Sequence, residues 1–89
     1  MPYFTYMIRC CDGTLYTGWT DDIEKRLDAH NKGAGSRYTR VRLPVELAYS
    51  EEFNSKSEAM RREQVIKKMT RAAKQHLIDK SQNGGASLI

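Results

Sequence analysis

The sequence predicts a small single domain of the α/β (α+β) class, with about three helices flanking a three-stranded, mainly antiparallel sheet. Three observations support this class. Two segments rich in β-branched and aromatic residues lie on either side of an Asp-Gly pair, as in a β-hairpin. Two capping-box patterns each precede a segment with helical spacing of apolar residues. A further segment alternates apolar and polar residues, as a half-buried strand does, so the predicted order of elements is ββαβαα.

The length and composition fit one domain. The 89 residues include 39% hydrophobic and 29% charged residues, an ordinary soluble mixture. A chain of this length buries roughly 60–70% of its unfolded surface, enough for one modest core. No apolar run approaches the ~20 residues of a membrane span, and the N-terminus lacks signal-peptide features. Cys10 and Cys11 are adjacent, a spacing that favours neither a disulfide between them nor a metal site. We therefore expect one buried and one exposed thiol. We also expect a cytoplasmic protein without membrane contact.

The first part of the chain predicts the β-hairpin. Residues 3–9 and 15–20 are rich in strand-forming residues, and Asp12 and Gly13 form the tight turn between them. Gly18 lies inside the second strand, where a glycine indicates a bulge or a close approach of other atoms to the backbone. We therefore expect Gly18 to have a structural role.

A helix is predicted to follow the hairpin directly. Asp21, with Glu24 three residues later, forms a capping box, and Gly33 supplies the end of the helix. Arg26 and His30 lie one turn apart beside its narrow apolar stripe. Two interpretations are open: both side chains extend from a buried stripe into solvent, or both line a functional site.

The second half of the chain predicts a loop, a strand and two helices. Residues 33–36 form a flexible loop that runs into 37–40, and residues 45–50 alternate as the third strand. The run Ser55–Glu58 is the second capping box, which opens a long helix. A shorter helix is expected from residue 71 to about residue 80, followed by a flexible tail over 81–89.

Glu63 stands out on the predicted long helix. At about 100° per residue, it falls within one apolar arc. The apolar members of this arc are Ala59, Met60, Ile66 and Met69. A carboxylate among core positions is unfavourable unless it is paired or binds a metal. Glu63 is therefore either a buried acid paired with an Arg or Tyr, or an acid directed into a cleft.

Basic residues gather in two stretches of a chain with a net charge of +4. Residues 32–42 contain four basic residues and no acidic one, and residues 54–80 contain eight basic and three acidic residues. These stretches suit a polyanion such as nucleic acid, and the alternative is a solvated basic surface. The residues that we expect to contact a nucleic-acid backbone are Lys32, Arg37, Arg40, Arg42, Lys67, Lys68 and Lys74.

Together, these features resemble the GIY-YIG nuclease domain. Tyr16-Thr17-Gly18 stands at the position of the second family motif, and Tyr6 stands at the tyrosine of the first. The helix after the second motif carries Arg26 and, one turn later, His30, as the family pattern does. The run that ends at Glu63 resembles the metal-binding helix of the family. The segment from Arg40 to Leu47 and the C-terminal end of the Glu63 helix are similar to the small stand-alone bacterial members of the family. We expect the domain to cover residues 1–80.

The resemblance implies a metal-dependent endonuclease that hydrolyses DNA phosphodiester bonds, selects DNA structure rather than sequence, and acts in repair or recombination. It implies five catalytic residues: Tyr6, Tyr16, Arg26, His30 and Glu63. Glu63 would bind one Mg²⁺ (or Mn²⁺), and Arg26 would hold the phosphate. The base is Tyr6, Tyr16 or His30; we favour Tyr6 assisted by His30, with nearby cations lowering the pKa of the tyrosine. We expect a monomer without a small-molecule cofactor.

Two other functions remain open. The first is a catalytically weak or inactive nucleic-acid-binding module. It is favoured because Phe4-Thr5-Tyr6 keeps only the tyrosine of the first motif, and Lys74-Gln75-His76 offers no Asn where the family often has one. The second is a protein-interaction domain that uses exposed Trp19 and Tyr38 as anchors.

Overall fold

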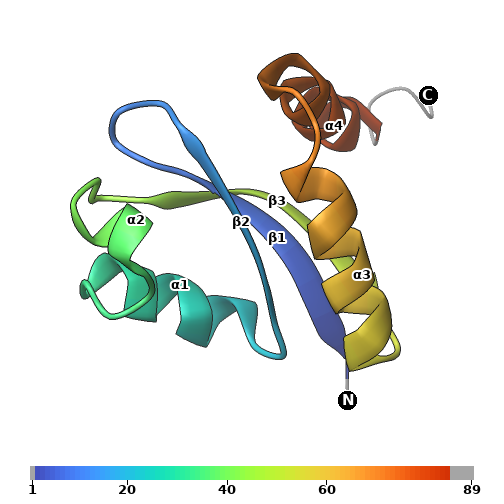
Figure 1. Ribbon diagram of the computed structural model, residues 1–89, viewed down its shortest axis with the longest axis horizontal. Helices are drawn as coiled ribbons and strands as arrows, with labels where there is room; N and C mark the ends of the chain where they lie inside the picture. Colours follow the sequence, from blue (N-terminus) through green and yellow to red (C-terminus); the bar gives the residue numbers. More distant parts are fainter. Residues whose placement is uncertain (1, 85–89) are drawn as a thin grey trace.

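The three strands form one antiparallel sheet in the order β2-β1-β3, with helices on both of its faces (Figure 1). The computed structural model describes residues 2–84. Its elements are β1 (Tyr3–Arg9), β2 (Leu15–Thr20), α1 (Ile23–Asn31), α2 (Arg37–Arg40), β3 (Glu46–Phe53), α3 (Lys56–Lys67) and α4 (Arg71–Gly84). The predicted fold class and the order ββαβαα are confirmed, with α2 as an additional short helix. No helix in the described part of the chain is long and apolar enough to cross a membrane.

The β1–β2 hairpin confirms the predicted turn and the role of Gly18. Gly13 has a φ of 85°, a left-handed conformation that glycine adopts without steric cost. Gly18 lies directly opposite Tyr6 in the register. A Cβ atom on Gly18 would lie 2.6 Å from the Tyr6 hydroxyl oxygen, so only glycine leaves room for this tyrosine.

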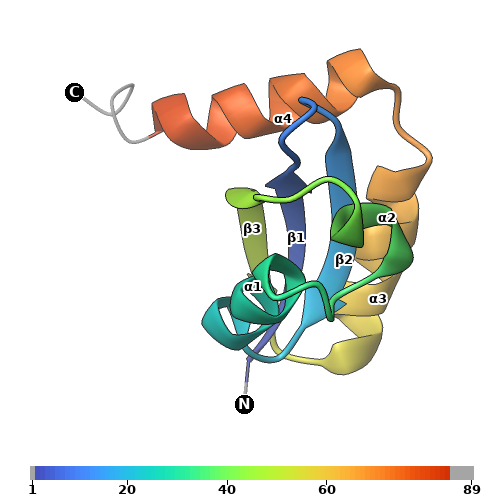
Figure 2. The ribbon, with the colours of Figure 1, turned by 90° about the vertical axis from the view of Figure 1, so that its left-hand side faces the viewer.

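Side chains alternate between the two faces of the sheet, and each face has its own core. On one face, Tyr6 and Ile8 of β1 pack with Cys10 and Val45 beneath α1 and α2 (Figure 2). On the other face, Met7 packs with buried residues of α3 and α4, which are Ile66 and Ile78. Cys10 is buried and Cys11 is exposed, as predicted.

Helix α3 has the predicted start but a narrower buried side. Ser55 is its N-cap and accepts a hydrogen bond from the Glu58 backbone N–H. Ala59 and Ile66 are fully buried, whereas Met60 is 41% exposed. The prediction that Met60 belongs to the buried arc is therefore wrong, because α3 presents only the side of Ala59 and Ile66 to the sheet.

Three predicted boundaries differ from the structure. The N-cap of α1 is Asp22 rather than Asp21, because Thr20 holds the Asp22 backbone N–H with its hydroxyl and shifts the helix start by one residue. Strand β3 extends to Phe53, three residues beyond the predicted end. Helix α4 continues to Gly84, and the remainder of the predicted tail, 85–89, lies outside the described residues.

Candidate active site

Tyr6 and His30 form a buried hydrogen-bonded pair between β1 and α1. The Tyr6 hydroxyl lies 3.0 Å from Nε2 of His30, and Nε of Arg26 donates to the same hydroxyl at 3.3 Å. His30 is 0% exposed and Tyr6 is 2% exposed. The interpretation in which His30 extends into solvent is therefore wrong. The turn of α1 that separates Arg26 from His30 brings both side chains to one tyrosine.

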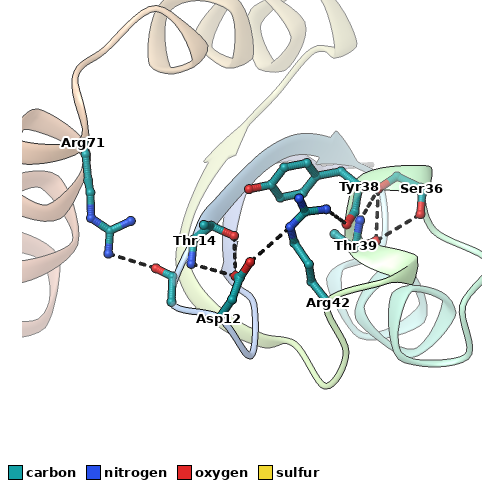
Figure 3. A network of polar contacts seen from close by, with 8 residues as sticks. Asp12, Thr14, Ser36, Tyr38, Thr39, Arg42 and Arg71 are labelled. Atoms are coloured by element: carbon teal, nitrogen blue, oxygen red, sulfur yellow. Dashed lines mark hydrogen bonds and ion pairs between the residues drawn. The ribbon is translucent and has the colours of Figure 1, made fainter.

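Tyr16 joins this group from β2. Its ring meets the ring of His30 edge-on, with 5.4 Å between the centroids. It also stacks on Tyr38 at 6.1 Å, with the two ring planes 23° apart. The guanidinium of Arg42 lies 3.8 Å from the centre of the Tyr38 ring, and Asp12 holds its Nε at 3.1 Å (Figure 3). Four of the five predicted catalytic residues thus gather on the face covered by α1 and α2.

The segment between α1 and α2 packs against the side chains of Arg26 and His30. The carbonyl oxygen of Gly35 accepts a hydrogen bond from Nη2 of Arg26 at 3.1 Å. A Cβ atom on Gly35 would overlap the ring of His30. Oγ1 of Thr39 lies 2.9 Å from Nδ1 of His30, and Ser36 caps α2 against Thr39. Residues 33–36 form a loop, as predicted, and this loop contacts two site residues, Arg26 and His30.

Gly35 and Thr39 are site residues that the sequence interpretation missed. One local signal was present: Ser36 lies three residues before Thr39, a spacing at which a serine caps the backbone N–H of a short helix. That signal indicates α2, but it does not indicate that Thr39 contacts His30.

Glu63 lies on α3, which covers the face of the sheet opposite to α1 (Figure 1). Its side chain is 13% exposed, and Oε2 lies 3.6 Å from Nζ of Lys67. The alternative in which Glu63 pairs with an Arg or a Tyr is therefore wrong. Among the described residues, the acid that pairs with both kinds of side chain is Glu51, which accepts hydrogen bonds from Tyr49 and Arg62, each at 2.9 Å. The negative charge of Glu63 makes a minor contribution to the raised pKa of Tyr6.

Burial controls the protonation of the two buried groups. It raises the pKa of Tyr6, although the hydrogen bond and the charge of Arg26 act in the opposite direction. Burial also lowers the pKa of His30, and the Arg26 charge adds to this effect. Arg26 thus acts on the pKa of Tyr6 in the expected direction, but burial outweighs it, so the pKa lies above its ordinary value. At neutral pH both Tyr6 and His30 are uncharged.

We expect the stability of the protein to fall as the pH decreases below about 6.5, the ordinary pKa of histidine. In the unfolded chain His30 binds a proton near that pH, whereas in the folded chain it does so only at lower pH. Between the two pKa values the unfolded state binds more protons, so acidification favours unfolding. Urea unfolding between pH 7.5 and 5 measures this slope. The His30→Gln variant should lose this component, whereas His76→Gln, at an exposed position, should keep it. Equal slopes for wild type and His30→Gln would contradict the assignment.

A groove of about 260 Å³ opens beside Tyr16 at the free edge of β2. Tyr38, Lys67 and Lys74 also line this groove, which we call the β2 groove. It therefore combines aromatic rings with positive charge, the side-chain types that contact nucleic acids.

The structure gathers only part of the predicted basic set. Lys67 and Lys74 line the β2 groove, and Arg42 lies over its Tyr38. Lys32 is instead paired with Asp28 at 2.7 Å along α1. The remaining predicted residues are exposed and do not line the groove: Arg37, Arg40 and Lys68.

The two predicted protein-interaction anchors differ in the structure. Tyr38 is 37% exposed, as expected, but Tyr16 and Arg42 pack against it. Trp19 is only partly exposed, with Nζ of Lys56 lying 5.1 Å from its ring centre. The prediction of an exposed Trp19 is therefore wrong.

The sequence matches the GIY-YIG catalytic domain over residues 2–77. With the ββαβαα order and the tyrosines on adjacent strands, this match shows that the chain belongs to the GIY-YIG family. Its relatives include UPF0213 protein SAG0778 of Streptococcus agalactiae, which is 54% identical over 83 residues, covering 93% of this chain and 94% of that protein. UPF0213 protein VNG_2274C of Halobacterium salinarum is 53% identical over 75 residues, or 84% of this chain and 97% of that protein.

Solved structures agree with this assignment. The solution NMR structure of UPF0213 protein BH0048 from Bacillus halodurans is 40% identical and superposes with a TM-score of 0.58 over 89% of this chain and 84% of that chain. The solution NMR structure of EF2693 from E. faecalis is 38% identical, with a TM-score of 0.57 over 86% and 83% of the two chains. The fold is therefore shared with UPF0213 proteins of known structure.

Proposed function

We propose that this chain is a metal-dependent endonuclease that hydrolyses DNA phosphodiester bonds. The observation that supports this most directly is the line of hydrogen bonds from Arg26 through Tyr6 to His30, beside Tyr16 and the β2 groove. The GIY-YIG family is typically a nuclease family, and its members act on nucleic acid. The test is Mg²⁺- or Mn²⁺-dependent nicking of supercoiled plasmid by the purified protein. Failure to cut any form of DNA or RNA with either metal would contradict the proposal.

Arg26 is suited to hold the scissile phosphate. A guanidinium carries five N–H donors in a planar fork. Nε and Nη2 contact Tyr6 and Gly35, so further donors remain for a phosphate oxygen. Because the two contacts fix the plane of the guanidinium, little ordering is needed when negative charge develops on the phosphate.

Burial favours Tyr16 as the group that meets the attacking water. Tyr6 and His30 are almost fully buried, whereas Tyr16 is half-buried and lines the β2 groove. The base is therefore Tyr16 rather than Tyr6 in this proposal. Tyr6 accepts the hydrogen bond of Arg26, and the oxygen of Tyr16 orients the water. Taking up the proton of the water requires the tyrosinate form of Tyr16, which forms by loss of its hydroxyl proton to solvent through the groove.

Glu63 is the residue that would hold the divalent cation. Among the described residues no three His, Cys, Asp or Glu side chains gather into a metal site, and a single carboxylate with water and phosphate is a set that suits Mg²⁺. The Glu63 side chain is mostly buried and has a cation, Nζ of Lys67, beside it. A divalent cation would have to displace Lys67 from this carboxylate. A bound cation would polarise the phosphate and stabilise the leaving oxygen.

Lys74 provides a test of whether DNA binds along the β2 groove. Because it lines the β2 groove, Lys74→Gln should weaken DNA binding similarly for all sequences and lower the slope of log K against log salt by about 1. Lys80→Gln, an exposed lysine nearly two turns further along α4, is the matched control and should change the slope much less. Fluorescence anisotropy over a salt series measures both. Equal slopes for the two variants would argue against the groove as the DNA path.

A specific observation favours the second candidate, a nucleic-acid-binding module without useful catalysis. The Lys67–Glu63 ion pair already neutralises the carboxylate that a metal would need. The two candidates differ in their response to Glu63→Gln. A nuclease loses cleavage, whereas a binding module binds DNA as before or more tightly and has no cleavage to lose.

A further inference from the structure

The Tyr6 hydroxyl can donate its hydrogen to only one of its two hydrogen-bond partners. Its two partners are Nε of Arg26 and Nε2 of His30. Arg26 can only donate, so it occupies a lone pair of the tyrosine oxygen. The hydroxyl is buried, and burying a donor without an acceptor is unfavourable. Within the described structure, the hydrogen of Tyr6 must therefore point to His30, and Nε2 of His30 must be the acceptor.

This assignment fixes the other side of the imidazole. A neutral imidazole with an accepting Nε2 carries its hydrogen on Nδ1. The partner of Nδ1 is Oγ1 of Thr39 at 2.9 Å, so the threonine accepts. The hydrogen of Thr39 in turn has acceptors in Ser36, whose Oγ lies at 3.0 Å and whose carbonyl oxygen lies at 3.4 Å.

We propose that Thr39 is a positioning residue: it accepts the Nδ1–H of the His30 tautomer that Arg26 and Tyr6 impose, and thereby holds the imidazole that orients Tyr6 and Arg26 for the phosphate. Thr39 is 0% exposed and cannot meet substrate, so it acts only through His30. With the opposite tautomer, two donors would face the Tyr6 oxygen and the tyrosine hydrogen would have no acceptor. The tautomer itself is independent of the proposed nuclease function; only the consequence for the phosphate rests on it.

The tautomer is measurable in the wild-type protein. NMR of [¹⁵N]histidine-labelled protein, at a pH where His30 is neutral, distinguishes Nδ1–H from Nε2–H by the ¹⁵N shifts of the ring, and exposed His76 provides an internal reference. We expect the Nδ1–H form for His30. A wild-type spectrum of the Nε2–H form would overturn the proposal, whether or not the protein cuts DNA.

Substitutions then test the role of Thr39. Thr39→Val keeps the side-chain shape and removes the acceptor, so the Nδ1–H of His30 should lose its hydrogen bond and its NMR signal should shift and exchange faster with water, whereas Thr39→Ser should keep the wild-type signal. Cleavage should fall in Thr39→Val by up to about 100-fold, because a misplaced catalytic group costs on that order. An unchanged Nδ1–H signal of His30 in a folded Thr39→Val protein would overturn the proposal. If Thr39→Val does not fold, the wild-type spectrum and Thr39→Ser still decide.

Thr5→Val is the matched control for burial. Thr5 is also a 0% exposed threonine, but it lies on the opposite face of the sheet, where its hydroxyl donates to the Ala59 carbonyl at 2.7 Å. This variant should lose stability without changing the Nδ1–H signal of His30. A change of that signal in Thr5→Val equal to the change in Thr39→Val would show a general effect of core damage and would overturn the specific role of Thr39.

Discussion

Replacing Glu63 with glutamine is expected to abolish metal-dependent DNA cleavage while leaving the fold intact. The amide has nearly the same shape as the carboxylate, and the only ion pair of Glu63 in the described structure is the one with Lys67. Losing the single negative charge proposed to hold the cation should reduce cleavage by about 100-fold or more, the order seen when one stabilising group is removed. Plasmid nicking with Mg²⁺ measures the activity, and urea unfolding checks the fold.

Glu58→Gln is the matched control for this substitution. Glu58 lies on the same helix at the position of the capping box, where glutamine is also a favourable residue. It should therefore retain both cleavage and stability. Cleavage by Glu63→Gln at the wild-type rate would remove Glu63 from the site. Wild-type protein that binds DNA but never cuts it would support the binding module instead.

Replacing Gly35 with alanine is expected to destabilise the protein and to disorganise the site together. The new methyl group would occupy the position of the His30 imidazole, and the carbonyl of the same residue holds Arg26. Overpacking of this kind costs about 1–3 kcal/mol. Urea unfolding measures the cost, and the His30 ring signals in NMR report the displacement. Ala34→Ser, at an exposed neighbouring position, should have little effect.

A double-mutant cycle shows whether His30 is the cause of this cost. His30→Ala creates the space that the methyl group needs, so Gly35→Ala should cost much less in that background. An equal cost in both backgrounds would mean that the backbone of the segment, rather than its contact with His30, demands glycine.

Local signals explain how much of the fold was predictable. The Asp-Gly turn, the third strand and the Ser55 cap each depend on residues a few positions apart, and all three were predicted. The predicted alternation of the third strand is wrong, because Leu47 is 40% exposed. Helix α2 is only four residues long, too short for any periodicity to appear. The α1 cap was misplaced because both Asp21 and Asp22 fit a cap, and the hydrogen bond that the Asp22 backbone N–H donates to Thr20 decides between them.

Only the site residues that belong to the family motifs could be predicted from the sequence. Tyr6, Tyr16, Arg26 and His30 come from motif spacing, and the structure brings them together. Gly35 and Thr39 act through tertiary contacts with His30, and residues of these types are also common in ordinary loops. The helical wheel indicated that Glu63 is largely buried, but it could not show that its partner is Lys67.

The division of the site between the two faces of the sheet has a consequence for cooperativity. Tyr6 belongs to the core beneath α1 and accepts a hydrogen bond from Arg26 of that helix, whereas Glu63 lies on α3, which packs on the opposite face of the sheet. Neither core alone can assemble the complete set of groups. If the protein is the proposed nuclease, partial detachment of α3 and α4 would abolish cleavage while the hairpin and α1 remained folded, so cleavage would report local opening more sensitively than the signals of the remaining structure.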